Sequence, residues 1–226
     1  MHPPDFWQDI YPPGTVPLDG PLTTAFPAMF ADGRHLLLPI RPLPDGEHAL
    51  ASLIVNQASF AVVEALAADL ARQLAAYEPE VIVGLPTLGL TLASAVAHLL
   101  GHTRYVPLGT SKKFWYEERL SVPLSSITTP DLSKRLFIDP RLLPLLEGRR
   151  VALVDDVIST GSSIAAGLAL LGLAGIEPVA IGAAMLQSDR WQQRLGGAQP
   201  DWTTRILGVL RTPLLRKLED GSWSAT

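Results

Sequence analysis

The chain has 226 residues and a mass of 24.3 kDa, which allows one large hydrophobic core, or a core with a small appendage. Hydrophobic residues make up 47% and charged residues 18%, as in globular proteins, and the net charge of -4 gives no general affinity for nucleic acid. Cysteine is absent, which excludes disulfides and thiolate sites. Because there is neither a long uncharged apolar run nor a signal-peptide pattern in residues 1–11, we expect a cytoplasmic protein without a membrane span.

The first part of the chain, residues 1–34, is rich in proline. Proline cannot donate to a β-ladder, so we expect an irregular arm without strands or helices. An irregular stretch of this length is unusual inside a compact domain, which favours a lid or a subunit clasp. The arm also carries aromatic residues that indicate packing against another surface, namely Phe6, Trp7, Tyr11, Phe26 and Phe30.

Strand and helix patterns alternate after the arm. The expected strands cover residues 35–40, 49–55, 81–84, 104–108, 134–138, a stretch beginning at 151, 178–184 and 205–210. The expected helices cover residues 58–77, 91–100 and 164–174. This alternation predicts an α/β fold with a doubly wound parallel sheet, helices on both faces, and ligands beyond the carboxyl ends of the strands.

We expect one structural domain with three parts. Residues 1–50 would form the proline-rich arm and a hood, residues 51–200 the core, and residues 201–226 a C-terminal strand and a polar tail.

The most informative segment, residues 151–163, reads Val-Ala-Leu-Val-Asp-Asp-Val-Ile-Ser-Thr-Gly-Ser-Ser. Apolar β-formers, two acids, small hydroxyl residues and a following Ala- and Leu-rich stretch predict a buried strand, a sharp loop and a helix N-terminus. The free amides of that terminus and the loop hydroxyls can donate to an anion. Asp155 and Asp156 can accept hydrogen bonds from hydroxyls. A sugar phosphate requires both features, donors for its phosphate and acceptors for its hydroxyls.

This segment resembles the motif with which type I phosphoribosyltransferases bind 5-phosphoribosyl 1-diphosphate (PRPP), and the resemblance extends over about residues 50–190. It implies that Asp155 and Asp156 hold the ribose 2′- and 3′-hydroxyls and that the loop holds the 5′-phosphate. The implied PRPP-binding residues are Asp155, Asp156, Val157, Ser159, Thr160, Gly161, Ser162 and Ser163. The alternative is an ordinary α/β turn with acids at a strand end, as in receiver domains, but those domains carry the acids after their first strand.

A second strand–loop–helix unit follows the strand at 81–84. The resemblance implies that its loop donates backbone amides to the leaving diphosphate. The implied pyrophosphate-loop residues are Leu85, Pro86, Thr87, Leu88 and Gly89. Many family members have a basic residue where this chain has Leu88, and others have a small polar one. From the residues alone, a plain turn is equally consistent.

Residues 111–130 combine adjacent lysines, three adjacent aromatics and many hydroxyls. In the family, a mobile loop at this place closes over the diphosphate and supplies cations, often to the neighbouring subunit. The implied catalytic residues are therefore Lys112 and Lys113 together with Asp155 and Asp156. Closure would exclude water from the reacting centre. A solvated surface hairpin with an aromatic plug is the alternative.

The resemblance places the nucleobase beside the strand that follows the PRPP motif, with the arm as a hood. The implied base-binding residues are Asn56, Met185, Leu186, Gln187 and Trp191. Residues 55–57 resemble a segment of xanthine phosphoribosyltransferases, but those enzymes have a lysine where this chain has Gln187. Gln187 therefore either reads a purine edge or fills space.

The implied reaction joins a nucleobase, with a purine favoured, to PRPP and yields a nucleoside 5′-monophosphate and pyrophosphate, as in purine salvage. The family resemblance also implies Mg²⁺, held indirectly by Asp155 and Asp156 through the ribose and waters, and a homodimer. Neither nucleic acid nor membrane is an expected partner. Two alternatives stay open: a non-catalytic PRPP- or nucleotide-binding regulator, and a phosphoribosyltransferase with a non-purine acceptor.

Overall fold

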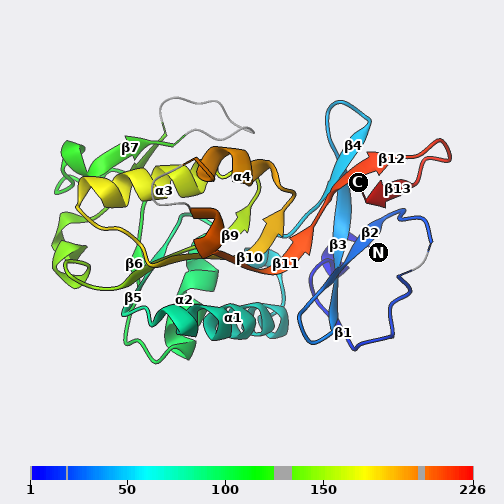
Figure 1. Ribbon diagram of the computed structural model, residues 1–226, viewed down its shortest axis with the longest axis horizontal. Helices are drawn as coiled ribbons and strands as arrows, with labels where there is room; N and C mark the ends of the chain where they lie inside the picture. The colour runs from blue at the N-terminus through cyan, green and yellow to red at the C-terminus, as the bar shows by residue number, and fades with distance from the viewer. Residues whose placement is uncertain (1, 19, 125–133, 198–201, 226) are drawn as a thin grey trace.

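The computed structural model describes residues 2–18, 20–124, 134–197 and 202–225, which form two lobes side by side (Figure 1). The larger lobe, the core, holds a parallel sheet flanked by helices. The smaller lobe, the hood, is an antiparallel sheet that contains both ends of the chain.

The core sheet has five parallel strands in the order β11-β10-β9-β5-β6. Their bounds are Val81–Gly84 (β5), Val106–Pro107 (β6), Val151–Ile158 (β9), Ala180–Gln187 (β10) and Ile206–Thr212 (β11). β10 is buried along its whole length, as expected for a central parallel strand covered on both faces.

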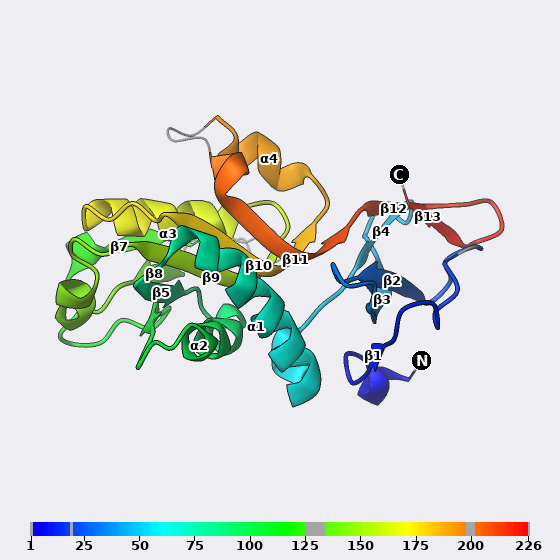
Figure 2. The same cartoon turned by 60° about the horizontal axis from the view of Figure 1, so that its bottom comes forward.

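Helices cover both faces of this sheet (Figure 2). α1 (Phe60–Leu74) and α2 (Gly89–Leu99) pack on one face, and α3 (Ser162–Leu173) with the short α4 (Arg190–Leu195) on the other. Ser59 caps the start of α1 by accepting a hydrogen bond from the Val62 amide. The arrangement confirms the expected α/β fold with a parallel sheet.

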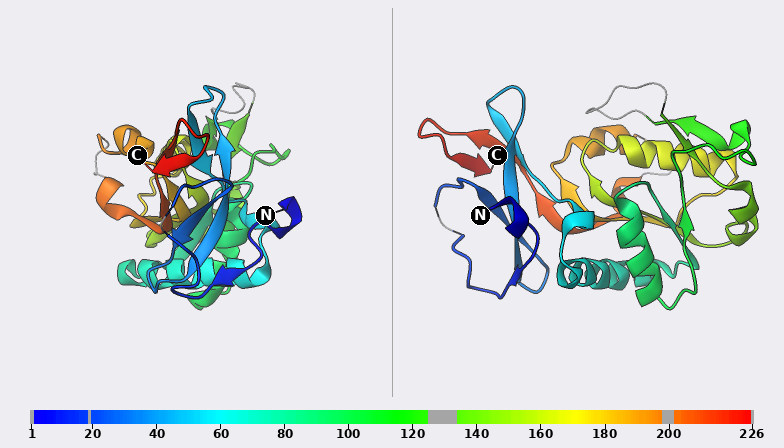
Figure 3. Two further views of the ribbon diagram at one scale, coloured as in Figure 1. Left: turned by 90° about the vertical axis from the view of Figure 1, so that its right-hand side faces the viewer. Right: turned by 180° about the vertical axis from the view of Figure 1, so that it is seen from behind.

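The hood sheet runs in the order β1-β3-β4-β12-β13, with β2 paired to β3. Its strands are Ile10–Tyr11 (β1), Ala25–Met29 (β2), His35–Pro42 (β3), His48–Ala51 (β4), Leu214–Lys217 (β12) and Trp223–Ala225 (β13). Every pairing is antiparallel. The view from behind shows this sheet beside the core lobe (Figure 3), and hood residues such as Leu36 and Leu38 share one apolar cluster with α1.

One expectation about the chain ends was wrong. The arm is not free of strands, because β1 and β2 lie within residues 1–34; Pro27 is tolerated since β2 pairs with β3 alone and is therefore an edge strand. In the polar tail, β12 and β13 extend the hood sheet beyond β4. The expected packing of the arm is confirmed for Phe6, Trp7 and Phe30, which are buried.

The chain crosses between the lobes at two places. Pro213 alone separates β11 of the core from β12 of the hood. The other crossing, between β4 and α1, is held by the arm, since the Trp7 indole N–H donates to the Ser52 carbonyl over 2.8 Å. The hood is therefore fastened beside the carboxyl ends of the core strands.

Short elements complete the fold. The 3₁₀ helices are Pro3–Asp5, Val55–Gln57, Ala75–Tyr77, Glu118–Leu120, Pro140–Leu145 and Trp202–Arg205. β7 (Ser121–Pro123) and β8 (Arg135–Phe137) form a separate antiparallel pair. Within the described residues, no helix combines the length and apolarity that a membrane crossing requires.

Candidate functional site

The acid pair lies in β9, the middle strand of the core sheet. Asp155 is 5% exposed, and its Oδ1 accepts a hydrogen bond of 2.9 Å from the backbone N–H of Asp156. Burial raises the pKa of Asp155 well above its ordinary range, and the neighbouring Asp156 carboxylate raises it further. Burial also raises the pKa of Asp156. A buried and a half-buried carboxyl group this close favour a ligand that donates hydrogen bonds.

The loop after the acid pair encloses a small hollow of about 80 Å³, lined by Asp155, Val157 and residues 158–164. Gly161, at φ +76°, turns the chain into α3, which begins at Ser162 and leaves its first amides without intrahelical partners. The hydroxyls of Thr160 and Ser162 lie 3.1 Å apart in this loop. The hollow exceeds the roughly 30 Å³ that one water occupies, and donors surround it.

The loop before α2 lies directly against the acid pair. A Cβ atom on Gly89 would lie 2.7 Å from Oδ1 of Asp155 and 2.9 Å from its Cα. At the start of the loop, Leu85 is buried, and its N–H donates to the Val154 carbonyl over 2.9 Å. Leu88 is half-buried and Thr87 exposed, and the peptide bond between Pro86 and Thr87 is cis. The structure thus brings together the two loops that the resemblance assigned to phosphate and pyrophosphate.

The lysines of the 111–124 segment do not reach the acid pair in this structure. Lys112 is engaged by Glu118, with 2.6 Å between Nζ and Oε2, and Lys113 is exposed. The rest of the segment predicted as a mobile loop, residues 125–130, lies outside the described residues.

Trp115 anchors the same segment to the core. Its indole N–H donates to Asp139 over 3.2 Å, and the Arg141 guanidinium lies 4.4 Å from the centre of its ring. Hydrogen bonds from Arg141 hold the pKa of Asp139 at about 2. One side of the segment is therefore fixed to the rest of the core.

The five residues expected to bind the base do not gather in one place. Met185 is fully buried on the α1 side of the sheet, and Leu186, 2% exposed, packs on the α3 side. Trp191 is 3% exposed and packs beside Gly161. Consecutive residues of β10 point to opposite faces, both of which are covered, so Met185 and Leu186 lie in the core, and Trp191 packs from α4 against Gly161.

The two polar members of that set are engaged elsewhere. Gln187 is buried, and its side-chain amide donates to the Ala51 carbonyl of β4 over 2.6 Å, which ties the core to the hood. Gln187 was expected either to read a purine edge or to fill space, and in the structure its amide makes a structural contact. Asn56 accepts a 2.9 Å hydrogen bond from the Thr91 hydroxyl at the start of α2. It lies near the pyrophosphate loop rather than beside β10.

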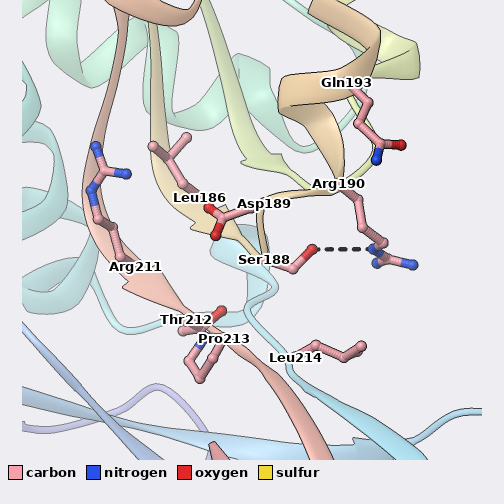
Figure 4. A pocket seen from close by; sticks show the side chains of 9 residues that line it. All are labelled: Leu186, Ser188, Asp189, Arg190, Gln193, Arg211, Thr212, Pro213 and Leu214. Carbon is pink, nitrogen blue, oxygen red and sulfur yellow. Dashed lines mark hydrogen bonds between the residues drawn. The ribbon is translucent and has the colours of Figure 1, made fainter. Parts of the chain in front are cut away.

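A cavity of about 580 Å³ lies where β10 and β11 end, beside the hood (Figure 4). It is lined by Leu186, Ser188, Asp189, Arg190, Gln193, Arg211, Thr212, Pro213 and Leu214. Among these, Arg190 contacts the phosphate loop: its Nη2 donates to Ser159 Oγ over 3.0 Å. The sequence analysis missed this residue. The pair Arg190 and Arg194, one helical turn apart and directly after a strand, was the available indication.

Comparisons with known proteins agree with this geometry. Residues 51–200 match the family model described as phosphoribosyl transferase domain. The chain belongs to this family. Its type I resemblance is thereby confirmed at the level of the family.

Curated relatives and solved structures carry related names. The chain is 35% identical over 130 residues to an adenine phosphoribosyltransferase of Corynebacterium efficiens, which covers 56% of this chain but only 61% of that protein. It is 32% identical over 152 residues to one of Frankia casuarinae, covering 65% and 76% of the two chains.

The fold has close counterparts at low identity. The Giardia lamblia adenine phosphoribosyltransferase complexed with 9-deazaadenine superposes with a TM-score of 0.61 at 20% identity, covering 77% of this chain and 93% of that one. The Thermoanaerobacter pseudethanolicus enzyme gives 0.58 at 20% identity, covering 77% and 95%. These likenesses show the fold.

Proposed function

We propose that this phosphoribosyltransferase-family protein transfers the phosphoribosyl group of PRPP to a purine base and releases pyrophosphate. The observation that carries the proposal is the convergence of three groups: an acid pair of buried Asp155 and half-buried Asp156, a donor-lined hollow of about 80 Å³ and the Gly89 loop against Asp155. A phosphorylated ribose that carries a diphosphate presents a phosphate on C5, a diol on C2 and C3 and a leaving group on C1.

Each part of the site has one task in this proposal. Asp155 and Asp156 accept hydrogen bonds from the ribose 2′- and 3′-hydroxyls, and residues 159–163 donate to the 5′-phosphate. The backbone of residues 85–89 donates to the diphosphate. The bond from ribose C1 to the diphosphate oxygen breaks, and that oxygen keeps the electron pair. A ring nitrogen of the base bonds to C1 and gives up its proton to the departing pyrophosphate or to solvent. Positive charge develops on the ribose beside the carboxylates, which stabilise it.

We also propose that Mg²⁺ takes part. Among the described residues, no three His, Cys, Asp or Glu side chains gather into a metal site, so the protein alone offers only the adjacent Asp155 and Asp156. That sparse donor set fits a cation that keeps its waters and takes most of its oxygen ligands from a substrate. When bound, Mg²⁺ would neutralise charge on the leaving diphosphate. Asp155 and Asp156 would hold it indirectly, through the ribose hydroxyls and waters.

A purine acceptor is supported by the names of the relatives. Two curated relatives are adenine phosphoribosyltransferases, and one structural counterpart contains 9-deazaadenine. Adenine is therefore the first base to test. A cytoplasmic location and a homodimer remain predictions, and gel filtration with light scattering measures the second.

The decisive experiment combines PRPP, Mg²⁺ and a panel of purine and pyrimidine bases, with chromatography for new nucleotide and a pyrophosphate assay. The double variant Asp155→Ala/Asp156→Ala should lose PRPP binding by calorimetry while its circular dichroism stays that of the wild type. As the matched control, Asp32→Ala removes an exposed acid and should bind PRPP normally. Unchanged PRPP affinity in the double variant would overturn the site assignment.

One observation favours a second candidate, a PRPP-binding regulator without transferase activity. The pyrophosphate loop carries the half-buried, uncharged Leu88 and no basic residue between Leu85 and Gly89. Tight PRPP binding without a product from any base would identify that function.

A further inference from the structure

Helix α4 packs directly on the outer side of the phosphate loop. Its apolar face meets Gly161: a Cβ atom there would lie 3.2 Å from Leu195 and 3.4 Å from Trp191. Its two arginines reach the residues just before that glycine. Arg190 Nη2 donates to Ser159 Oγ over 3.0 Å, and Arg194 Nε donates to the Thr160 carbonyl over 3.2 Å.

Arg190 also donates a hydrogen bond to a second serine, at the end of β10. Its Nε donates to Ser188 Oγ over 3.1 Å, so one guanidinium joins two serine hydroxyls (Figure 4). Ser188 is 8% exposed and lies at φ +59°, a left-handed conformation that a non-glycine residue adopts only where the surroundings impose it. The backbone at the end of β10 is thus shaped to present this hydroxyl to Arg190.

No carboxylate neutralises the Arg190 charge. Within the described ranges, Arg190 forms no ion pair, and the adjacent Asp189 instead accepts from the Gln192 amide over 3.2 Å. Together with Arg194, the guanidinium therefore adds positive charge beside a loop whose own donors are uncharged amides and hydroxyls.

The contact also determines what the Ser159 hydroxyl can do. A serine hydroxyl has one donor hydrogen and two acceptor lone pairs. Because Arg190 can only donate, it occupies an acceptor site of Ser159, and the hydroxyl hydrogen is left free to point into the hollow that Ser159 lines. A hydroxyl polarised by a cation is a stronger donor to an anion than an isolated one.

We propose that Arg190 is a positioning residue for the 5′-phosphate, which holds Ser159 as a donor and adds positive charge to the phosphate loop. The inference rests on the proposed function, since it takes the hollow as the place of that phosphate. This positioning role requires arginine in particular. Lysine keeps the charge, but its single ammonium cannot span the two serine hydroxyls with the rigid fork of a guanidinium.

The test measures the binding of ribose 5-phosphate, which carries the 5′-phosphate without the diphosphate, by calorimetry. We expect Arg190→Gln to weaken binding roughly 10- to 100-fold, the usual effect of losing a hydrogen bond to a charged group. Arg190→Lys should restore part of the loss. Pyrophosphate affinity should stay within about twofold of the wild type, and the KM for PRPP should rise more than kcat falls.

A double-variant cycle with Ser159→Ala separates positioning from bulk charge. If Arg190 acts through Ser159, then Arg190→Gln in the Ser159→Ala background should cause clearly less loss than in the wild type. Arg211→Gln is the matched control: Arg211 lines the same cavity and, in the part of the chain that the structure describes, forms no hydrogen bond or ion pair with the phosphate loop. The variant should leave ribose 5-phosphate binding unchanged.

Three results would overturn the inference. The first is an Arg190→Gln variant that binds ribose 5-phosphate as tightly as the wild type. The second is a double variant with Ser159→Ala whose loss of affinity equals the sum of the two single losses. The third is an Arg211→Gln variant that loses as much affinity as Arg190→Gln. If the wild type itself binds neither ribose 5-phosphate nor PRPP, the proposed function fails and the inference fails with it. Melting curves of each variant check that the fold is kept when Arg190, an exposed side chain, is replaced.

Discussion

Gly89 lies directly against Asp155 in the fold, although the two are far apart in the sequence: a Cβ atom at Gly89 would lie 2.7 Å from Oδ1 and 2.9 Å from Cα of Asp155. Glycine at the start of α2 therefore allows the two loops to meet. A side chain at this position must push either the α2 terminus or the backbone of β9 away.

Gly89→Ala should accordingly impair the site more than the fold. Because the new methyl group meets backbone atoms, we expect about 1–3 kcal/mol lower stability and at least a tenfold loss in PRPP affinity. Urea unfolding and calorimetry measure the two quantities. Gly172→Ala is the control: that α3 glycine has nothing within 4 Å, so alanine should stabilise the protein by about 0.5–1 kcal/mol without changing PRPP binding. If Gly89→Ala and Gly172→Ala have the same effect on stability and on PRPP affinity, the close approach of Gly89 to Asp155 is contradicted.

The raised pKa of Asp155 predicts a stability cost at neutral pH. A carboxyl whose pKa is higher in the folded than in the unfolded chain binds more protons when folded, so stability falls as pH rises from about 4 towards the folded pKa and stays lower above it. Asp155→Asn removes this cost and keeps an oxygen that can accept from the Asp156 N–H. The variant should be more stable than the wild type at pH 7, with the difference shrinking as pH falls from the folded pKa towards about 4 and vanishing below that pH.

Urea titrations of both proteins at pH 7 and at about pH 3.5 check this prediction. The same variant should bind PRPP poorly, because a neutral amide is a weaker acceptor for the ribose hydroxyls. A wild type that is more stable than Asp155→Asn at pH 7 would show that the carboxylate is held by favourable contacts instead.

The parts of the site that lie close in sequence could be predicted, and the parts made by packing could not. The acid pair and residues 159–163 occupy one strand–loop–helix unit, so the local pattern was sufficient to assign them. Arg190 reaches Ser159 across 31 positions, through the docking of α4, and no local pattern encodes that docking. The same holds for Gln187, whose amide bonds to Ala51 at a separation of 136.

In the fold, too, elements set by local sequence could be predicted, and elements that form through distant pairing could not. Apolar runs such as β9 and β10 were recognisable because parallel strands covered on both faces have few polar residues. The strands β2 and β12 were missed, one because it contains Pro27 and the other because it follows Pro213 and ends in charged residues. Both form through pairing with distant strands, as in the register of Leu214 with Leu50.

Asp139 should stabilise the anchor of the 111–124 segment in a pH-dependent way. Its pKa is about 2, lowered from 3.8 mainly by hydrogen bonds from Arg141, so its contribution is present above pH 4 and is lost as pH falls through about 2. Asp139→Asn keeps the capping oxygen that accepts from the Arg141 N–H. Since the Arg141 side chain is 65% exposed, we expect a loss of only about 1 kcal/mol at pH 7.

The measurement is urea unfolding of the wild type, Asp139→Asn, Arg141→Gln and the double variant at pH 7 and near pH 2. The cycle should give a coupling of about 1 kcal/mol at pH 7 and almost none at pH 2. A coupling that persists at pH 2 would mean that the contact depends on packing over Trp115 rather than on the ionised carboxylate.

Asp69 joins the hood to the core through a buried ion pair. This α1 residue is 3% exposed, its Oδ2 lies 3.6 Å from Nη2 of Arg34, which directly precedes β3, and it is also paired with Arg72 on its own helix. Asp69→Asn removes the charge that both arginines face. We expect the free energy of unfolding to fall by about 1–3 kcal/mol, because a buried carboxylate with two partners gives up strong hydrogen bonds, and this should appear as a lower urea midpoint.

Asp32→Asn is the matched control: Asp32 also pairs with Arg34, at 2.6 Å, but is 53% exposed, so its removal should cost less than about 0.5 kcal/mol. If the two variants lose equal stability, burial of Asp69 contributes nothing and the two lobes are held together by their apolar contacts alone.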